Sequence, residues 1–182
     1  MTKNLAKYIY KKMLNEPRNY QWRVVIDEGK GAVEIYFVLT LELKAHENVQ
    51  DINAQVNKED TLYFEDVVCF YDKENTKIVP ENYLYAVPLD AEVGIERGYV
   101  DAFLKQLNIV ASNGRSQLRK FFAEESQQEF SLNWNEENMK NTVRTMRKTK
   151  KYSKEILDFS TNEEQSLVDQ FKEEQYDGME RV

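Results

Sequence analysis

The chain has 182 residues, with 32 acidic and 25 basic side chains, and its net charge is −7. An apolar content of 41% with 12% aromatic residues excludes a disordered chain, and the length suits one domain with a tail. The longest uncharged apolar run, Ile35–Leu41, is far shorter than the roughly 20 residues of a membrane span. The single cysteine, Cys69, excludes an intramolecular disulfide, so we expect a soluble, acidic, cytoplasmic protein.

The first predicted element is an amphipathic helix that ends before Pro17. Its apolar side chains recur at helical spacing: Leu5, Tyr8, Ile9 and Met13. A β-hairpin follows, because apolar side chains alternate over residues 20–26 and 33–43 around a turn at 27–31. The one-sided alternation predicts an antiparallel sheet with one packed face.

Three more segments predict strands, because their apolar residues alternate over 62–71, 83–87 and 129–135. Pro80 and Pro88 bracket the second of these, which suits an edge strand since proline lacks the N–H donor of a ladder. The polar segment 44–60 is predicted to be a loop, and 72–82 a connector.

Four further helices complete the pattern. One spans Ile95 to Val110 and ends at Asn113-Gly114 in the manner of a left-handed cap, and a shorter one surrounds Leu118. The next begins after Asn135, with acidic residues first and basic residues last. A capping box at Thr161 and Glu164 predicts the last.

These elements predict an α+β fold. Residues 1–135 form a domain with an antiparallel sheet of four to five strands and helices packed on one face, and residues 136–182 form a helical, charged C-terminal extension.

Asp66 is the candidate for a catalytic residue, because strand alternation places its carboxylate on the apolar face with Phe64 and Val68. A carboxylate there either has a raised pKa, finds a hydrogen-bonded partner such as a Tyr, Lys or Arg, or forces a bulge. The functional alternative is a carboxylate-dependent, metal-assisted hydrolase centred on Asp66. One histidine and one cysteine exclude the familiar zinc spacings, and no cofactor is predicted.

Two groups of side chains are candidates for an interaction surface. Five tyrosines fall on neighbouring predicted strands, where those on one face would form an amphipathic surface: Tyr36, Tyr63, Tyr71, Tyr83 and Tyr85. The basic helix 140–151 carries Arg144, Arg147 and Lys148. These bases also complement the helix dipole, and Tyr152 beside them suits stacking on a base, so nucleic-acid binding is a second alternative. Contact with the chain's own acidic tail, or with a partner's, is favoured over it.

Three stretches, "FEDVVCFYDKENTKIVPENYLYAVPLD", "GIERGYVDAFLKQL" and "EFSLNWN", resemble a family of Gram-positive bacterial proteins, the domain-of-unknown-function family numbered three thousand and thirteen. The resemblance spans about Leu62 to Asn135. It implies a small acidic cytosolic protein and supplies no activity, cofactor or site residue.

The predicted function is therefore a noncatalytic protein-interaction module, chaperone-like or an adaptor. The order of its elements is similar to that of small acidic secretion-type chaperones. The expected partner is a protein, which includes a second copy of this chain, and nucleic acid and membrane are not expected partners.

Overall fold

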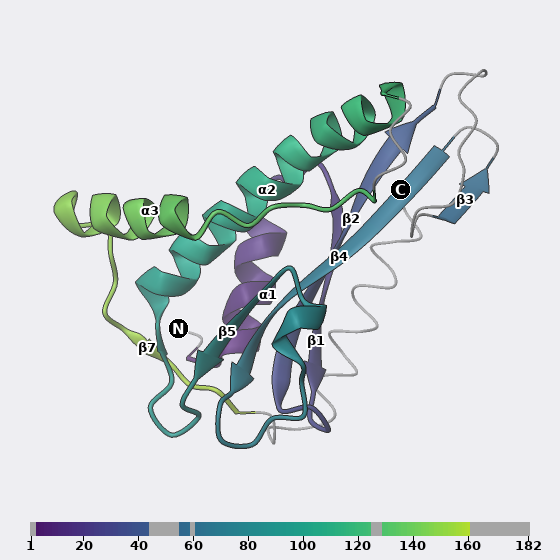
Figure 1. Cartoon of the computed structure of the whole chain (residues 1–182). Coiled ribbons are helices and arrows are strands. Elements are labelled where there is room, and N and C mark those ends of the chain that lie inside the picture. Colours follow the sequence, from purple (N-terminus) through teal and green to yellow (C-terminus); the bar gives the residue numbers. More distant parts are fainter. Residues whose placement is uncertain (1–2, 44–54, 59–60, 125–128, 161–182) are drawn as a thin grey trace.

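The computed structural model describes residues 3–43, 55–58, 61–124 and 129–160, which form the α+β fold that the sequence predicts (Figure 1). Its elements in chain order are α1 (Leu5–Asn15), β1 (Gln21–Asp27), β2 (Ala32–Glu42), β3 (Gln55–Lys58), β4 (Thr61–Asp72), the 3-10 turn η1 (Pro80–Asn82), β5 (Tyr85–Leu89), β6 (Ile95–Glu96), α2 (Arg97–Ala123), α3 (Glu136–Lys148) and β7 (Ile156–Leu157). The predicted final helix lies outside the described residues. Within the described part of the chain, none of the helices has the length and apolar character needed to cross a membrane.

The main sheet has the order β1-β2-β4-β3, and these four strands pair antiparallel. The predicted hairpin of β1 and β2 is confirmed, with Trp22 opposite Phe37 and Ile26 opposite Val33. Gly31 ends its turn with a φ of +62°, and a Cβ there would lie 2.4 Å from the carbonyl oxygen of Asn75. Only glycine fits both the left-handed backbone and this close approach.

Two strand predictions were wrong in part. Residues 55–58, predicted as loop, form β3 and pair with β4. The strand expected over 83–87 begins at Tyr85, includes Pro88, and pairs parallel with β4 rather than antiparallel. Alternation of apolar residues does not reveal the direction of a strand. Here the connector returns along β4, and after η1 the chain enters β5 in the same direction as β4. Pro88 is tolerated because β5 pairs with β4 alone among the described strands.

The fifth strand expected over residues 129–135 was also wrong, because this segment is extended but pairs with no described strand. Its alternation instead reflects one-sided packing. The Phe130 ring lies 5.0 Å from Phe64, the Trp134 ring lies 4.9 Å from Phe103, and Leu132 is buried. Period-two patterning reports which side of an extended chain is buried, whether or not a ladder forms.

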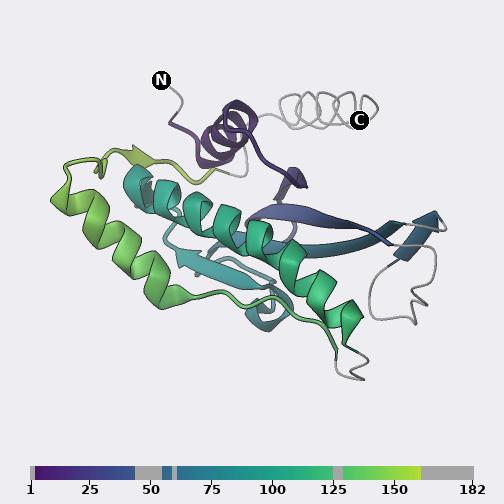
Figure 2. The ribbon, with the colours of Figure 1, turned by 90° about the horizontal axis from the view of Figure 1, so that it is seen from above.

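Helix α2 is one continuous helix of 27 residues, so the predicted end at Asn113-Gly114 and the separate helix around Leu118 were wrong. Gly114 does not have a positive φ. A Cβ at Gly114 would lie 2.8 Å from side-chain atoms of Leu39 and Leu132, so the glycine marks close packing within the helix. Helices α1 and α2 cover the same face of the sheet, and α3 runs alongside α2 (Figures 1 and 2).

The segment 149–158, which we call the return segment, brings the chain from α3 back to the start of α2. The backbone N–H groups of Arg97 and Gly98 donate to the carbonyls of Glu155 and Ser153, each at 2.8 Å. Both are first-turn donors that a helix cannot satisfy itself. A Cβ on Gly98 would lie 2.6 to 2.8 Å from three ring atoms of Tyr152, so this ring lies directly on the helix backbone.

This contact predicts how Gly98 tolerates substitution. Alanine is favoured over glycine in a helix by about 1 kcal/mol. We nevertheless expect Gly98→Ala to lower the free energy of unfolding by about 1 to 3 kcal/mol, because the Tyr152 ring cannot move away as a flexible chain end can. The measurement is urea unfolding followed by circular dichroism. In a Tyr152→Ala background the same substitution should become stabilising, and an unchanged sign would contradict the contact.

Candidate functional site

A groove between α2 and α3, which we call the α3 groove, has a lining that suits a ligand. Its volume is about 420 Å³. Its lining combines apolar, phenolic and charged side chains: Tyr85, Tyr99, Glu136, Met139, Lys140, Val143, Arg144 and Arg147. Mixed lining of this kind buries an apolar group while a few polar side chains fix its orientation.

The inner wall of the groove is mostly apolar, and stacking holds one of its aromatic rings. Met139 is buried on α3, and Val143 is half-buried one turn further along. The Tyr85 ring stacks on Trp134, with centroids 4.8 Å apart and an interplanar angle of 10°. Burial raises the pKa of Tyr85 and of Tyr99, so both phenols stay neutral at physiological pH and keep their hydroxyl protons.

The rim of the groove is cationic. Positions 140, 144 and 147 step by four and three along α3, which places their side chains on one face of the helix. Each pairs with one carboxylate: Lys140 with Glu136 at 3.2 Å, Arg144 with Glu137 at 3.5 Å, and Arg147 with Glu96 at 3.7 Å. The cationic side chains are 57% to 61% exposed, and such surface pairs are worth at most about 1 kcal/mol. A ligand carboxylate can therefore replace these partners.

A second hollow of about 410 Å³ adjoins the first, because Arg147 lines both. Its other lining residues are Glu96, Tyr152 and Lys154. The Tyr152 hydroxyl donates to Glu96, and the Arg147 guanidinium lies 4.6 Å from the centroid of the Tyr152 ring. With Gly98 also against it, this ring is already engaged by the protein and offers a poor platform for a base.

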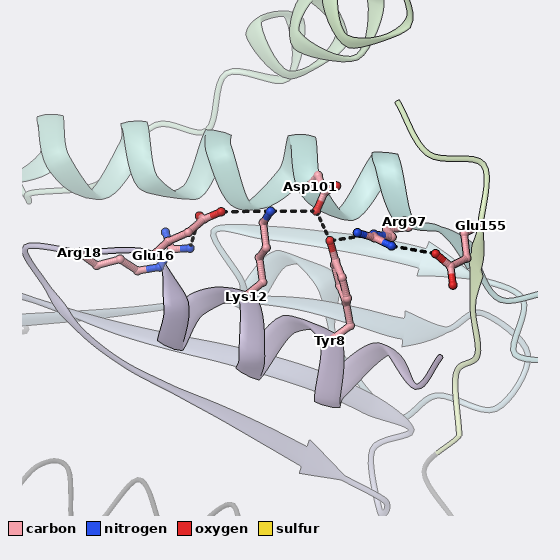
Figure 3. Close-up of polar contacts among 7 residues, drawn as sticks. All are labelled: Tyr8, Lys12, Glu16, Arg18, Arg97, Asp101 and Glu155. Atoms are coloured by element: carbon pink, nitrogen blue, oxygen red, sulfur yellow. Dashed lines mark hydrogen bonds and ion pairs between the residues drawn. The ribbon is translucent and has the colours of Figure 1, made fainter. Parts of the chain in front are cut away.

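A polar ladder between α1, α2 and the return segment holds the N-terminal end of α2 in place (Figure 3). The Tyr8 hydroxyl donates to Asp101 at 2.5 Å and accepts from the Nε of Arg97 at 3.2 Å, and Arg97 also binds Glu155 at 2.8 Å. Burial and the Asp101 carboxylate raise the pKa of Tyr8 to about 12. Further along α1, the ladder continues through Lys12. Its groups satisfy one another, so we assign the ladder a structural role.

The predicted interaction residues separate into two places. Tyr85, Arg144 and Arg147 meet in the α3 groove, whereas Lys148 is exposed on α3 and does not line it. Tyr36, Tyr63 and Tyr71 lie on the other face of the sheet, because their register alternates with that of the buried residues. The groove residues that sequence reasoning missed include Tyr99 and Lys140, although the spacing of 140, 144 and 147 was a usable signal.

On that outer face, Glu34 is only 1% exposed yet fully engaged. Its carboxylate accepts from Lys30 at 3.1 Å, from Tyr36 at 3.0 Å and from Tyr83 at 2.5 Å. The Tyr83 contact fixes the connector over the sheet. Cys69, opposite Glu34 on β4, is buried, and burial raises the pKa of its thiol to about 12. A thiol with so high a pKa is a poor nucleophile.

Asp66 remains on the inner face of β4, opposite Phe37, and the β2–β4 register continues past it without a bulge. It is half-buried and accepts a hydrogen bond from the Val67 backbone N–H at 2.8 Å, rather than from a Tyr, Lys or Arg. Desolvation raises its pKa, and the Val67 hydrogen bond partly offsets this. In the part of the chain that the structure describes, no three His, Cys, Asp or Glu side chains gather in a way that could hold a metal ion.

Residues 1–161 match the family model described as "Protein of unknown function (DUF3013)", and the chain belongs to this family. The match confirms the resemblance and extends it to both sides of Leu62–Asn135. The chain is also similar to a solved structure described as "Crystal Structure of Conserved Protein of Unknown Function from Enterococcus faecalis", with 20% sequence identity and a TM-score of 0.71 over 82% of this chain and 91% of that chain. At this identity the likeness shows the fold alone. A search of curated proteins found no match.

Asp66 provides a test of the structural interpretation. Because its pKa is raised in the folded state, the folded protein binds this proton more tightly than the unfolded chain, and the charged form costs stability above that pKa. We expect Asp66→Asn to raise the free energy of unfolding at pH 7 by on the order of 1 kcal/mol. The gain should shrink as the pH falls through the folded pKa, where the wild type becomes neutral too.

Urea unfolding of both proteins at pH 7 and at mildly acidic pH measures this difference. Glu65→Gln is the matched control on the same strand, since Glu65 is exposed and bound by Arg23 at 2.8 Å, and it should be neutral or slightly destabilising. A loss of stability in Asp66→Asn would mean that the carboxylate charge has a stabilising partner.

Proposed function

We propose that the chain is a noncatalytic protein-interaction module, and that its α3 groove binds an acidic, partly apolar segment of a partner protein. The observation that carries the proposal is the composition of the groove: an apolar inner wall beneath three exposed cations on one face of α3. An acidic segment with apolar anchors complements both features.

The apolar wall accounts for affinity. Met139, Val143 and Tyr85, whose ring is backed by Trp134, give a surface on which a leucine or phenylalanine side chain can be buried. Burial of such a side chain is worth about 1.5 to 3 kcal/mol. Because stacking holds the Tyr85 ring, binding requires less ordering of this side chain.

The cationic rim accounts for selectivity. The whole chain carries a net charge of −7, whereas residues 136–152, on and beside α3, carry a net charge of +4. The carboxylates now paired with Lys140, Arg144 and Arg147 are exposed and weakly held, which lets a ligand displace them. Complementary charge of this kind chiefly sets partner choice and association rate.

Nucleic acid suits the groove less well than an acidic peptide. Its recognition depends on stacking of bases on open aromatic rings as well as on phosphate contacts. Tyr152 is packed against Gly98 and Arg147, and Tyr85 is stacked on Trp134.

Fluorescence anisotropy with the full chain tests the proposal. The probe is a fluorescein-labelled 12-residue peptide of glutamate, leucine and phenylalanine. We expect Lys140→Glu/Arg144→Glu to weaken its binding about tenfold, because two rim contacts become repulsive. The matched control is Arg119→Glu/Lys120→Glu, which makes the same charge change on exposed positions near the end of α2 and should leave the affinity within about twofold.

Two further probes decide between ligand classes. A peptide with glutamine in place of glutamate should bind much more weakly, and so should a 12-nucleotide oligouridylate. An equal loss of peptide affinity in the groove variant and in the α2 control variant would mean a nonspecific charge effect and would overturn the proposal. Groove-dependent binding of the oligonucleotide without binding of the acidic peptide would overturn it in favour of nucleic acid.

A further inference from the structure

The chain itself carries a segment with the chemistry that the α3 groove is proposed to bind. Residues 161–182 contain seven acidic and two basic side chains, and the family match ends at residue 161. The segment also contains apolar side chains at close spacing: Leu167, Val168, Phe171, Tyr176 and Met179. It is therefore both acidic and partly apolar, as the groove requires.

The segment starts close enough to reach the groove. Ile156 in β7 pairs with Glu96 in β6, and Glu96 lines the second hollow. Ser160, the last described position, comes four positions after Ile156, and four steps along the chain span at most about 14 Å. The following 22 residues cover about 33 Å even if fully helical, and more than twice that if extended.

Charge complementarity favours residues 161–182 as the occupant of the α3 groove. Residues 136–152 carry six basic and two acidic side chains, a net charge of +4, against a net charge of −5 for residues 161–182. Because the two segments belong to one chain, their contact is intramolecular, and effective concentrations between linked segments are on the order of millimolar. A contact that is weak between separate molecules is then well populated.

We propose that residues 161–182 occupy the α3 groove of their own chain and must be displaced before a partner protein binds. This inference rests on the proposed function of the groove and adds its regulation. A partner then succeeds only if its acidic segment also provides better apolar anchors than the chain's own.

The first experiment uses the full chain with its segment neutralised by seven substitutions to amides: Glu163→Gln, Glu164→Gln, Asp169→Asn, Glu173→Gln, Glu174→Gln, Asp177→Asn and Glu180→Gln. We expect the acidic 12-residue peptide to bind this variant about tenfold more tightly than the wild type. The reason is that the apparent affinity is proportional to the fraction of grooves that are free, which is smaller in the wild type. Lys140→Glu/Arg144→Glu in the neutralised background should abolish the gain.

The two proposals fail differently in this experiment. Equal, groove-dependent binding to the wild type and the neutralised variant would overturn the intramolecular contact and leave the groove as a peptide site. Failure of the peptide to bind even the neutralised variant would overturn the proposed function, and the present inference with it.

A second experiment locates the segment directly. A nitroxide on Gln175→Cys labels the segment selectively, because Cys69 is buried and its thiol pKa is raised to about 12. We expect strong broadening of the amide resonances of Lys140, Val143 and Arg144, and none at Arg119. No broadening on α3 would overturn the inference. Broadening of ¹⁵N-labelled chains only by added nitroxide-labelled ¹⁴N chains would also overturn it, by assigning the groove to a second copy.

Discussion

The packing of the return segment on the first turn of α2 is the constraint on which the candidate site depends. The backbone N–H groups of Arg97 and Gly98 are satisfied by the carbonyls of Glu155 and Ser153, and the Tyr152 ring occupies the space that any side chain on Gly98 would need. These contacts fix where α3 must end, and therefore how it lies beside α2. The α3 groove exists because the two helices are held at that spacing by residues outside both of its walls.

The distribution of satisfied and exposed charge is the reason that we propose binding rather than catalysis. Glu34 is surrounded by three donors, and the ladder runs from Glu155 through Arg97, Tyr8 and Asp101 to Lys12, so these charges hold elements of the fold together. A catalytic site needs perturbed groups that face a cleft. The α3 groove instead presents exposed cations on one face of a helix, and the proposed recognition of an acidic segment rests on them.

The sequence predicted what depends on local periodicity and missed what depends on contacts between distant segments. The β1–β2 hairpin and the inward face of β4 followed from alternation. Helix α3 begins after Asn135 as predicted, and the Asn135 side chain accepts from the Asn138 N–H at 3.0 Å. Gly114 was misread because its neighbours Leu39 and Leu132 are remote in sequence, so a packing glycine looked like a cap. Only one side of the groove could be predicted, for the same reason. Helix periodicity places Arg144 and Arg147 on one face, but nothing in the sequence shows that Tyr85 lies opposite them.

A cationic groove on an acidic protein also constrains what kind of partner can use it. Long-range repulsion from a protein of net charge −7 slows the approach of any acidic chain. At short range, Lys140, Arg144 and Arg147 attract an acidic chain whose carboxylates lie opposite them. Charge alone is thus not sufficient for affinity here, since a ligand must displace existing pairs and water for each contact it makes. Binding needs both terms: the cations of the rim favour an acidic segment, and a ligand without a side chain to bury against Met139 and Tyr85 gains little over solvent.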